Sequence, residues 1–137
     1  MKKETAKKLK IKENMIQKIK INHKSLDARK NKELNNVNNI EFICDDVANV
    51  IDSFKEKIDS IIVDPPRSGL DDKTVSYLKQ ISSNKIVYVS CDPITLARDL
   101  EKLSELYDID EITPVDMFPN TSHVECVSLL SRKKLEK

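Results

Sequence analysis

A chain of 137 residues has room for one domain with a modest hydrophobic core, and its formal net charge is +1. The chain has three cysteines, without CxxC spacing, and only two histidines. These counts argue against a disulfide framework and against a zinc or iron–sulfur site. The sequence has no signal-peptide pattern and no apolar run near the ~20 residues of a membrane span, which predicts a soluble, cytoplasmic protein without a membrane partner.

The first predicted element is a basic N-terminal arm, residues 1–21. Residues 1–39 contain 12 Lys/Arg and 4 Asp/Glu, whereas residues 40–137 contain 12 and 19. An arm of this charge would contact nucleic acid through phosphates, or it would be a solvated lysine-rich segment, and both alternatives stay open. Its apolar positions fit a loose amphipathic helix better than a strand. They are Leu9, Ile11, Met15, Ile16 and Ile19.

A polar helix is expected next over residues 22–36, ending in an asparagine-rich turn. Residues 40–44 then form a short strand, and Asp45 and Asp46 begin a helix that runs to about Lys57. Asp46 has an ordinary explanation as the N-cap of that helix.

The remainder of the chain alternates between apolar runs and helical patterns. We expect strands at residues 58–63, 86–90, 112–118 and 124–130, and helices at residues 71–82 and 93–107. This alternation predicts an α/β fold with a mostly parallel sheet and right-handed crossovers. The last two strands are too close for a helical crossover, so the last strand should be antiparallel.

Residues 64–69 (DPPRSG) separate the strand at 58–63 from the next helix, because two prolines continue neither a strand nor a helix. Gly69 is the only glycine in the chain. A cofactor loop of the GxGxxG kind is therefore excluded, since that loop needs glycines for tight turning and close backbone approach.

Cys91 lies where an apolar strand stops and a helix starts. Asp92 suits the N-cap of that helix, and Pro93 suits its first position. A thiol at a helix N-terminus is biased toward thiolate, the nucleophilic form. The competing interpretation is a buried structural cysteine, since free cysteine is among the most buried residue types.

Asp64, Cys91 and Glu125 are expected at one edge of the sheet, where open α/β sheets bind ligands. A thiolate and a carboxylate facing one pocket would suit addition to an electron-poor ring followed by proton removal. Each residue also has an ordinary explanation. Asp64 would be a turn former, Glu125 a solvent-facing strand residue and His123 a loop residue.

Three ordered motifs resemble those of the RNA uracil-5-methyltransferases of the TrmA/RumA type, which depend on S-adenosylmethionine. They are DPPRSGL at residues 64–70, VYVSCDPITLARDL at residues 87–100 and PVDMFPNTSHVECVSLL at residues 114–130. The resemblance extends from about Asp27 to Arg132. It implies an incomplete Rossmann-like methyltransferase fold in residues 22–137, the C-terminal part of the family's catalytic domain.

The resemblance also implies roles for individual residues. Cys91 resembles the nucleophile that attacks carbon 6 of uracil, and Glu125 resembles the base that removes the proton from carbon 5. Asp64 and Asp46 match positions that contact S-adenosylmethionine. Three further residues lie in motifs near the substrate, a uridine in tRNA or rRNA. These are Arg67, Phe118 and His123.

The family's glycine-rich cofactor loop, RNA-binding β-barrel and central domain have no counterpart in this sequence, so we expect a truncated fragment with little or no activity alone. It would self-associate or pair with a missing N-terminal fragment. The alternative is a non-catalytic remnant that binds RNA or a partner subunit. An Asp-Pro-Pro motif also occurs in amino-nitrogen methyltransferases, but there an aromatic follows the prolines, where this chain has Arg67.

Overall fold

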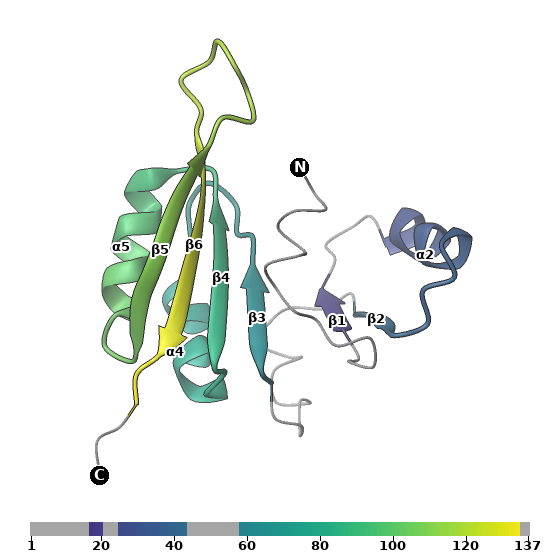
Figure 1. Cartoon of the computed structure of the whole chain (residues 1–137), viewed down its shortest axis with the longest axis horizontal. Helices are drawn as coiled ribbons and strands as arrows, with labels where there is room; N and C mark the ends of the chain where they lie inside the picture. The colour runs from purple at the N-terminus through teal and green to yellow at the C-terminus, as the bar shows by residue number, and fades with distance from the viewer. Residues whose placement is uncertain (1–16, 21–24, 44–57, 135–137) are drawn as a thin grey trace. The chain divides into compact units, whose positions relative to one another are not determined.

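The structure is a computed structural model that describes residues 17–20, 25–43 and 58–134 (Figure 1). The chain divides into two compact units, Met1–Val50 and Ile51–Lys137, and each is described by itself. The helix expected to begin at Asp45 and Asp46 lies outside the described residues.

In the first unit, β1 (Gln17–Lys20) pairs in parallel with β2 (Ile40–Ile43), and α2 (Ser25–Leu34) lies between them in the chain. The helix expected over residues 1–21 is therefore wrong for β1. These four residues form a strand because β2 offers a backbone ladder, and pairing of this kind overrides a weak local helical pattern. The predicted asparagine turn after α2 is confirmed, since Asn36 adopts a positive φ of 50°.

The second unit is built on a four-stranded sheet in the order β3-β4-β6-β5. Strand β3 runs parallel to β4, and β6 is antiparallel to both β4 and β5. Three strands thus share one direction and β6 opposes them, as the short β5–β6 connection predicted. The strands are β3 (Ser60–Val63), β4 (Lys85–Ser90), β5 (Tyr107–Val115) and β6 (Glu125–Arg132).

Helices α4 (Asp72–Ile81) and α5 (Pro93–Leu103) connect these strands. The Asp71 side chain caps α4 by accepting a hydrogen bond from the Thr74 amide. Helix α5 ends four residues earlier than the expected residue 107.

The early end of α5 follows from where Tyr107 lies. Its wholly buried hydroxyl group donates to the Leu78 carbonyl oxygen at 3.2 Å, so the chain has turned into β5 by this residue. Strand β5 consequently begins five residues before the expected residue 112 and ends at Val115, before the expected residue 118. The end of α5 therefore coincides with the burial of Tyr107, which the leucine spacing of the helix did not predict.

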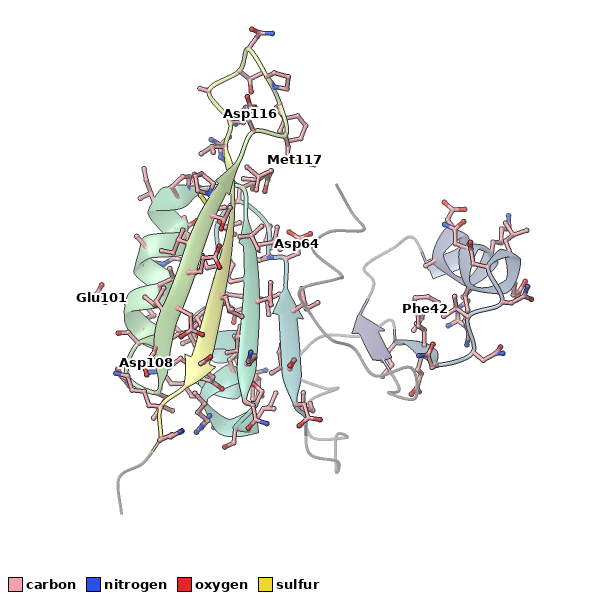
Figure 2. All side chains as sticks on the ribbon, viewed as in Figure 1. Phe42, Asp64, Glu101, Asp108, Asp116 and Met117 are labelled. Atoms are coloured by element: carbon pink, nitrogen blue, oxygen red, sulfur yellow. The ribbon has the colours of Figure 1, made fainter. Side chains whose placement is uncertain are left out.

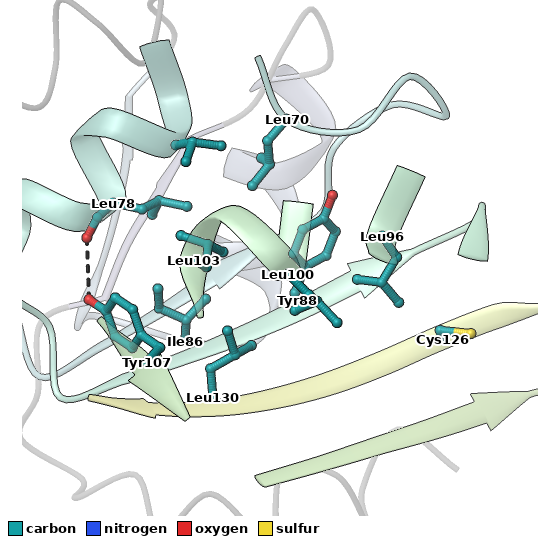
Figure 3. Packing of buried hydrophobic residues seen from close by; sticks show 11 residues of the cluster. Leu70, Leu78, Ile86, Tyr88, Leu96, Leu100, Leu103, Tyr107, Cys126 and Leu130 are labelled. Carbon is teal, nitrogen blue, oxygen red and sulfur yellow. Dashed lines mark hydrogen bonds between the residues drawn. The ribbon is translucent and has the colours of Figure 1, made fainter. Parts of the chain in front are cut away.

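A single apolar cluster joins α4 and α5 to one face of the sheet (Figure 3). Strand β4 contributes Ile86 and Tyr88, and β6 contributes Leu130, all three wholly buried. Full burial of such side chains contributes roughly 1.5–3 kcal/mol each. The core therefore fixes β4 and β6, the two strands whose ends carry Cys91 and Glu125.

Candidate active site

Cys91 directly follows β4 and is half-buried. The chain turns there because Asp92 is extended and Pro93 starts α5. The Ser90 hydroxyl group fixes the turn: it accepts from the Asp92 amide at 3.1 Å and lies 3.0 Å from the Asp92 carbonyl oxygen, to which it donates. A rigid strand and a capped helix thus hold the thiol from both sides.

Asp92, the residue after Cys91, is the N-cap of α5, as the sequence predicted. Its Oδ1 accepts hydrogen bonds from the Ile94 and Thr95 amides, each at 3.0 Å. The bond from the Thr95 amide is the main cause that lowers the pKa of the Asp92 carboxyl below its ordinary value, and Arg67 contributes further. The amides that were expected to favour a Cys91 thiolate are therefore engaged by a neighbouring carboxylate.

Glu125 is the first residue of β6. The antiparallel β4–β6 ladder ends with the pair of Ser90 and Cys126. Cys91 directly follows Ser90 and Glu125 directly precedes Cys126, so both residues lie at the same end of the β4–β6 pair, as the sequence predicted.

Asp64 directly follows β3 and is exposed at this same end of the sheet (Figure 2). Because β3 and β4 are parallel neighbours, Asp64 and Cys91 both follow strands that end there. The next residues form a loop, residues 64–70, that passes over the start of α5. From this loop Arg67, whose side chain is 64% exposed, places Nε 3.4 Å from Asp92 Oδ2.

A buried carboxylate, which the sequence analysis missed, lies under the 64–70 loop. Asp99 of α5 is 0% exposed, and its Oδ2 accepts from the Leu70 amide and the Tyr88 hydroxyl, each at 2.7 Å. Burial, followed by the bond to Asp99, raises the pKa of the Tyr88 hydroxyl well above its ordinary value. The helical spacing gives a signal of burial, since Asp99 lies three residues after Leu96 and four before Leu103, on the apolar face of α5, but it does not reveal the hydrogen-bond donors.

Phe118 and His123 lie in the connection between β5 and β6, which extends beyond the end of the sheet (Figure 1). Both are exposed. The Thr121 hydroxyl group organises this connection, accepting from the His123 amide at 3.2 Å and donating to the Phe118 carbonyl oxygen at 2.7 Å. None of the contacts found among the described residues joins either side chain to Cys91. Asp46 lies outside those residues.

Within the described part of the chain, no group of three His, Cys, Asp or Glu side chains is arranged to hold a metal ion. No helix there has both the length and the apolar character needed to cross a membrane.

Residues 4–133 match the family model described as tRNA (Uracil-5-)-methyltransferase. An uncharacterized RNA methyltransferase of Clostridium acetobutylicum is 49% identical over 107 residues, which are 77% of this chain and 24% of that protein. The chain spans about a quarter of the length of the curated relatives that it matches.

Two solved structures share the fold. The Pyrococcus abyssi tRNA (uracil-54, C5)-methyltransferase, in complex with S-adenosyl-L-homocysteine, is 47% identical with a TM-score of 0.66, over 75% of this chain and 25% of that chain. An rRNA methylase from Streptococcus thermophilus is 12% identical with a TM-score of 0.61, over 85% and 74%, which shows the fold alone. The predicted Rossmann-like α/β fold is confirmed.

Proposed function

This chain belongs to the tRNA (uracil-5-)-methyltransferase family, and from that premise we propose that it carries the nucleophile and the base of an RNA uracil-5-methylation site. The observation that carries the proposal is the register of β4 and β6, in which Ser90 pairs with Cys126. Ser90 and Cys126 are flanked at the end of the ladder by the Cys91 thiol, directly after Ser90, and by the Glu125 carboxylate, directly before Cys126. Addition to a ring and later removal of a proton from the adjacent carbon need such a pair.

The reaction divides between these two residues. The Cys91 thiolate adds to carbon 6 of uracil, and the electron pair of the 5,6 double bond moves toward carbon 5 and the carbon 4 carbonyl. Carbon 5 would receive the methyl group of the S-adenosylmethionine sulfonium, which would leave as S-adenosylhomocysteine, and the Glu125 carboxylate then takes the proton of carbon 5. The electrons of that carbon–hydrogen bond restore the double bond and expel the Cys91 thiolate. Loss of the proton from Glu125 to water returns the enzyme to its starting state.

S-adenosylmethionine supplies the electrophilic methyl group in this proposal. Asp64 is exposed beside the reactive end of the sheet, so its carboxylate is available to a polar cofactor. By the resemblance, Asp46 would be a second contact. On the substrate side, Arg67 offers an exposed guanidinium group next to Asp92, and Phe118 and His123 offer an exposed ring and imidazole.

The substrate we propose is a uridine in RNA, with tRNA tested before rRNA because the matching family model is described by tRNA. Uridine 54 is the first position to test, since the Pyrococcus abyssi relative is named for it. With tRNA as its substrate, the protein would act in the cytoplasm.

Release of tritium from tRNA labelled at carbon 5 of uridine tests the nucleophile. Addition of Cys91 to carbon 6 allows carbon 5 to exchange with water even without S-adenosylmethionine. We expect exchange by the unaltered chain and by Cys126→Ala, the matched control, and none by Cys91→Ala. Equal exchange by Cys91→Ala would contradict the assignment.

Glu125→Gln tests the base. With S-adenosylmethionine present, this variant should methylate carbon 5 but fail to lose the proton, so a covalent protein–RNA adduct should accumulate on a denaturing gel. Free methylated RNA formed at the unaltered rate would assign the proton transfer to another group.

The alternative, a non-catalytic chain that binds RNA or a partner subunit, is not favoured by the family match. The only glycine of the chain is Gly69, and it is used in the 64–70 loop. Calorimetric titration with S-adenosylmethionine separates the two: stoichiometric binding excludes the non-catalytic alternative, whereas the absence of binding supports it.

A further inference from the structure

Asp99 is a wholly buried carboxylate that the proposed reaction does not use. Its two oxygens receive hydrogen bonds from three elements: Oδ2 from the Leu70 amide and the Tyr88 hydroxyl, Oδ1 from Arg98 Nε at 2.9 Å. A buried carboxylate is costly unless such partners compensate it. These hydrogen bonds compensate the burial of Asp99, and the groups that donate them indicate what the carboxylate holds in place.

Helix α5 also makes several hydrogen bonds to the 64–70 loop, besides the one between Asp99 and the Leu70 amide. Arg98 donates from one guanidinium nitrogen to the Ser68 carbonyl oxygen at 2.9 Å and to the Leu70 carbonyl oxygen at 3.3 Å. The Thr95 hydroxyl donates to the Arg67 carbonyl oxygen at 3.1 Å. Successive backbone groups of the loop are thus bonded to one face of α5.

Gly69 shows how closely the loop lies on α5. A Cβ atom at this position would stand 2.5 Å from Asp99 Oδ2 and 2.6 Å from an Arg98 guanidinium nitrogen. The residue also has a φ of +78°, which L side chains rarely adopt. The single glycine of the sequence is therefore where the backbone must closely approach the buried Asp99 carboxylate and the Arg98 guanidinium.

The clamped loop carries Asp64 at one end and holds Arg67 against Asp92, the residue after Cys91. We propose that Asp99 is a positioning residue of this site, fixing the 64–70 loop so that the Arg67 guanidinium stays against Asp92, the residue next to Cys91 in the chain. The consequence for methyl transfer rests on the proposed function, whereas the placement of Arg67 is tested without it.

The first measurement is cleavage by an arginine-specific protease under native conditions. The chain contains four arginines, and the bond after Arg67 lies in the clamped loop. Asp99→Asn and Arg98→Ala should each accelerate cleavage at that bond about tenfold or more, because local opening becomes easier. Lys102→Ala, which removes only the exposed pair with Asp72, is the control and should cleave as the unaltered chain does.

The second measurement isolates the charge near Cys91. The rate of Cys91 alkylation by iodoacetate, divided by the rate with neutral iodoacetamide, reports local positive charge and cancels changes in exposure. Arg67→Ala should lower this ratio by roughly twofold or more, which is the effect of one unit charge within about 10 Å in water. Asp99→Asn and Arg98→Ala should lower it comparably, and Lys102→Ala should leave it unchanged.

A residue that only stabilised the fold would lower the denaturation midpoint without changing this ratio. The proposal is overturned if Asp99→Asn and Arg98→Ala both keep the ratio of the unaltered chain, or if Arg67→Ala keeps it. Neither measurement uses RNA or S-adenosylmethionine, so failure of the clamp and failure of the proposed methyl transfer are distinguished.

Discussion

The Tyr88 hydroxyl donates a hydrogen bond of 2.7 Å to Asp99 Oδ2 between two wholly buried side chains. Tyr88→Phe removes this donor and keeps the ring. We expect a loss of about 1 kcal/mol in the free energy of unfolding, together with faster protease cleavage after Arg67. Tyr107→Phe is the matched control, because the Tyr107 hydroxyl group bonds to the Leu78 carbonyl oxygen of α4 and none of its hydrogen bonds involves the 64–70 loop. It should destabilise the chain without exposing the Arg67 bond.

Gly69→Ala should be among the most damaging small substitutions in the second unit. The positive φ costs a non-glycine residue about 1–2 kcal/mol, and the added methyl group would overlap Asp99 and Arg98. Urea denaturation should show a lowered midpoint with an unchanged slope. Ser68→Ala, one residue away and exposed, is the control. A Gly69→Ala chain as stable as the Ser68→Ala chain would mean that the loop can lift from α5 at little cost.

Cys91 should react faster than Cys126 with a neutral alkylating reagent in the folded chain. Cys91 is half-buried at the end of the sheet, whereas Cys126 is 7% exposed and belongs to the apolar core. Mass spectrometry after brief iodoacetamide treatment should find modification at Cys91 first, and in urea the two should converge. Preferential labelling of Cys126 without denaturant would contradict the burial described above.

Asp92 predicts a specific dependence of stability on pH. The pKa of its carboxyl is lowered in the folded chain, so its contribution is complete above the ordinary value of 3.8 and is lost as pH falls through the folded pKa. Asp92→Asn keeps a capping oxygen without titrating. The difference in urea midpoint between the two chains should therefore change as the pH falls below about 4 and stay constant from pH 5 to pH 7. A constant difference at all pH values would argue against the lowered pKa.

Ser128 offers a stabilising substitution. Its side chain is 0% exposed, and its hydroxyl oxygen has no hydrogen-bond partner among the described residues. Because an unsatisfied buried hydroxyl group costs roughly 1–3 kcal/mol, Ser128→Ala should leave stability unchanged or raise it. Ser90→Ala is the contrast, since the Ser90 hydroxyl group is bonded to Asp92 and its loss should destabilise. Calorimetric melting of both variants checks the expected difference in sign.

Local sequence signals predicted the second unit well where strand and helix starts are chemically distinct. The N-cap Asp92 with Pro93 placed the start of α5, and the short connection before β6 required an antiparallel strand. The pairing partner of β1 could not be read from its four residues, because a parallel ladder joins segments far apart in the chain.

The candidate site divides in the same way. The positions of Cys91, Glu125 and Asp64 at one end of the sheet could be predicted because each directly follows or begins a strand. Their roles stay predictions. Asp99 was missed because its role depends on three donors from different elements, and nothing in its helical neighbourhood predicts them.

The β4–β6 ladder also determines where this chain tolerates changes of length. Residues 116–123 are exposed and lie beyond the paired strands, so an insertion there leaves the pairing of Ser90 with Cys126 intact. One residue added between Cys126 and Leu130 would put these two side chains on opposite faces of β6 and shift Glu125 out of its present register with β4, because strand side chains alternate with a period of two. Natural relatives should accordingly differ in length in this connection while keeping an unbroken run from Glu125 to Leu130.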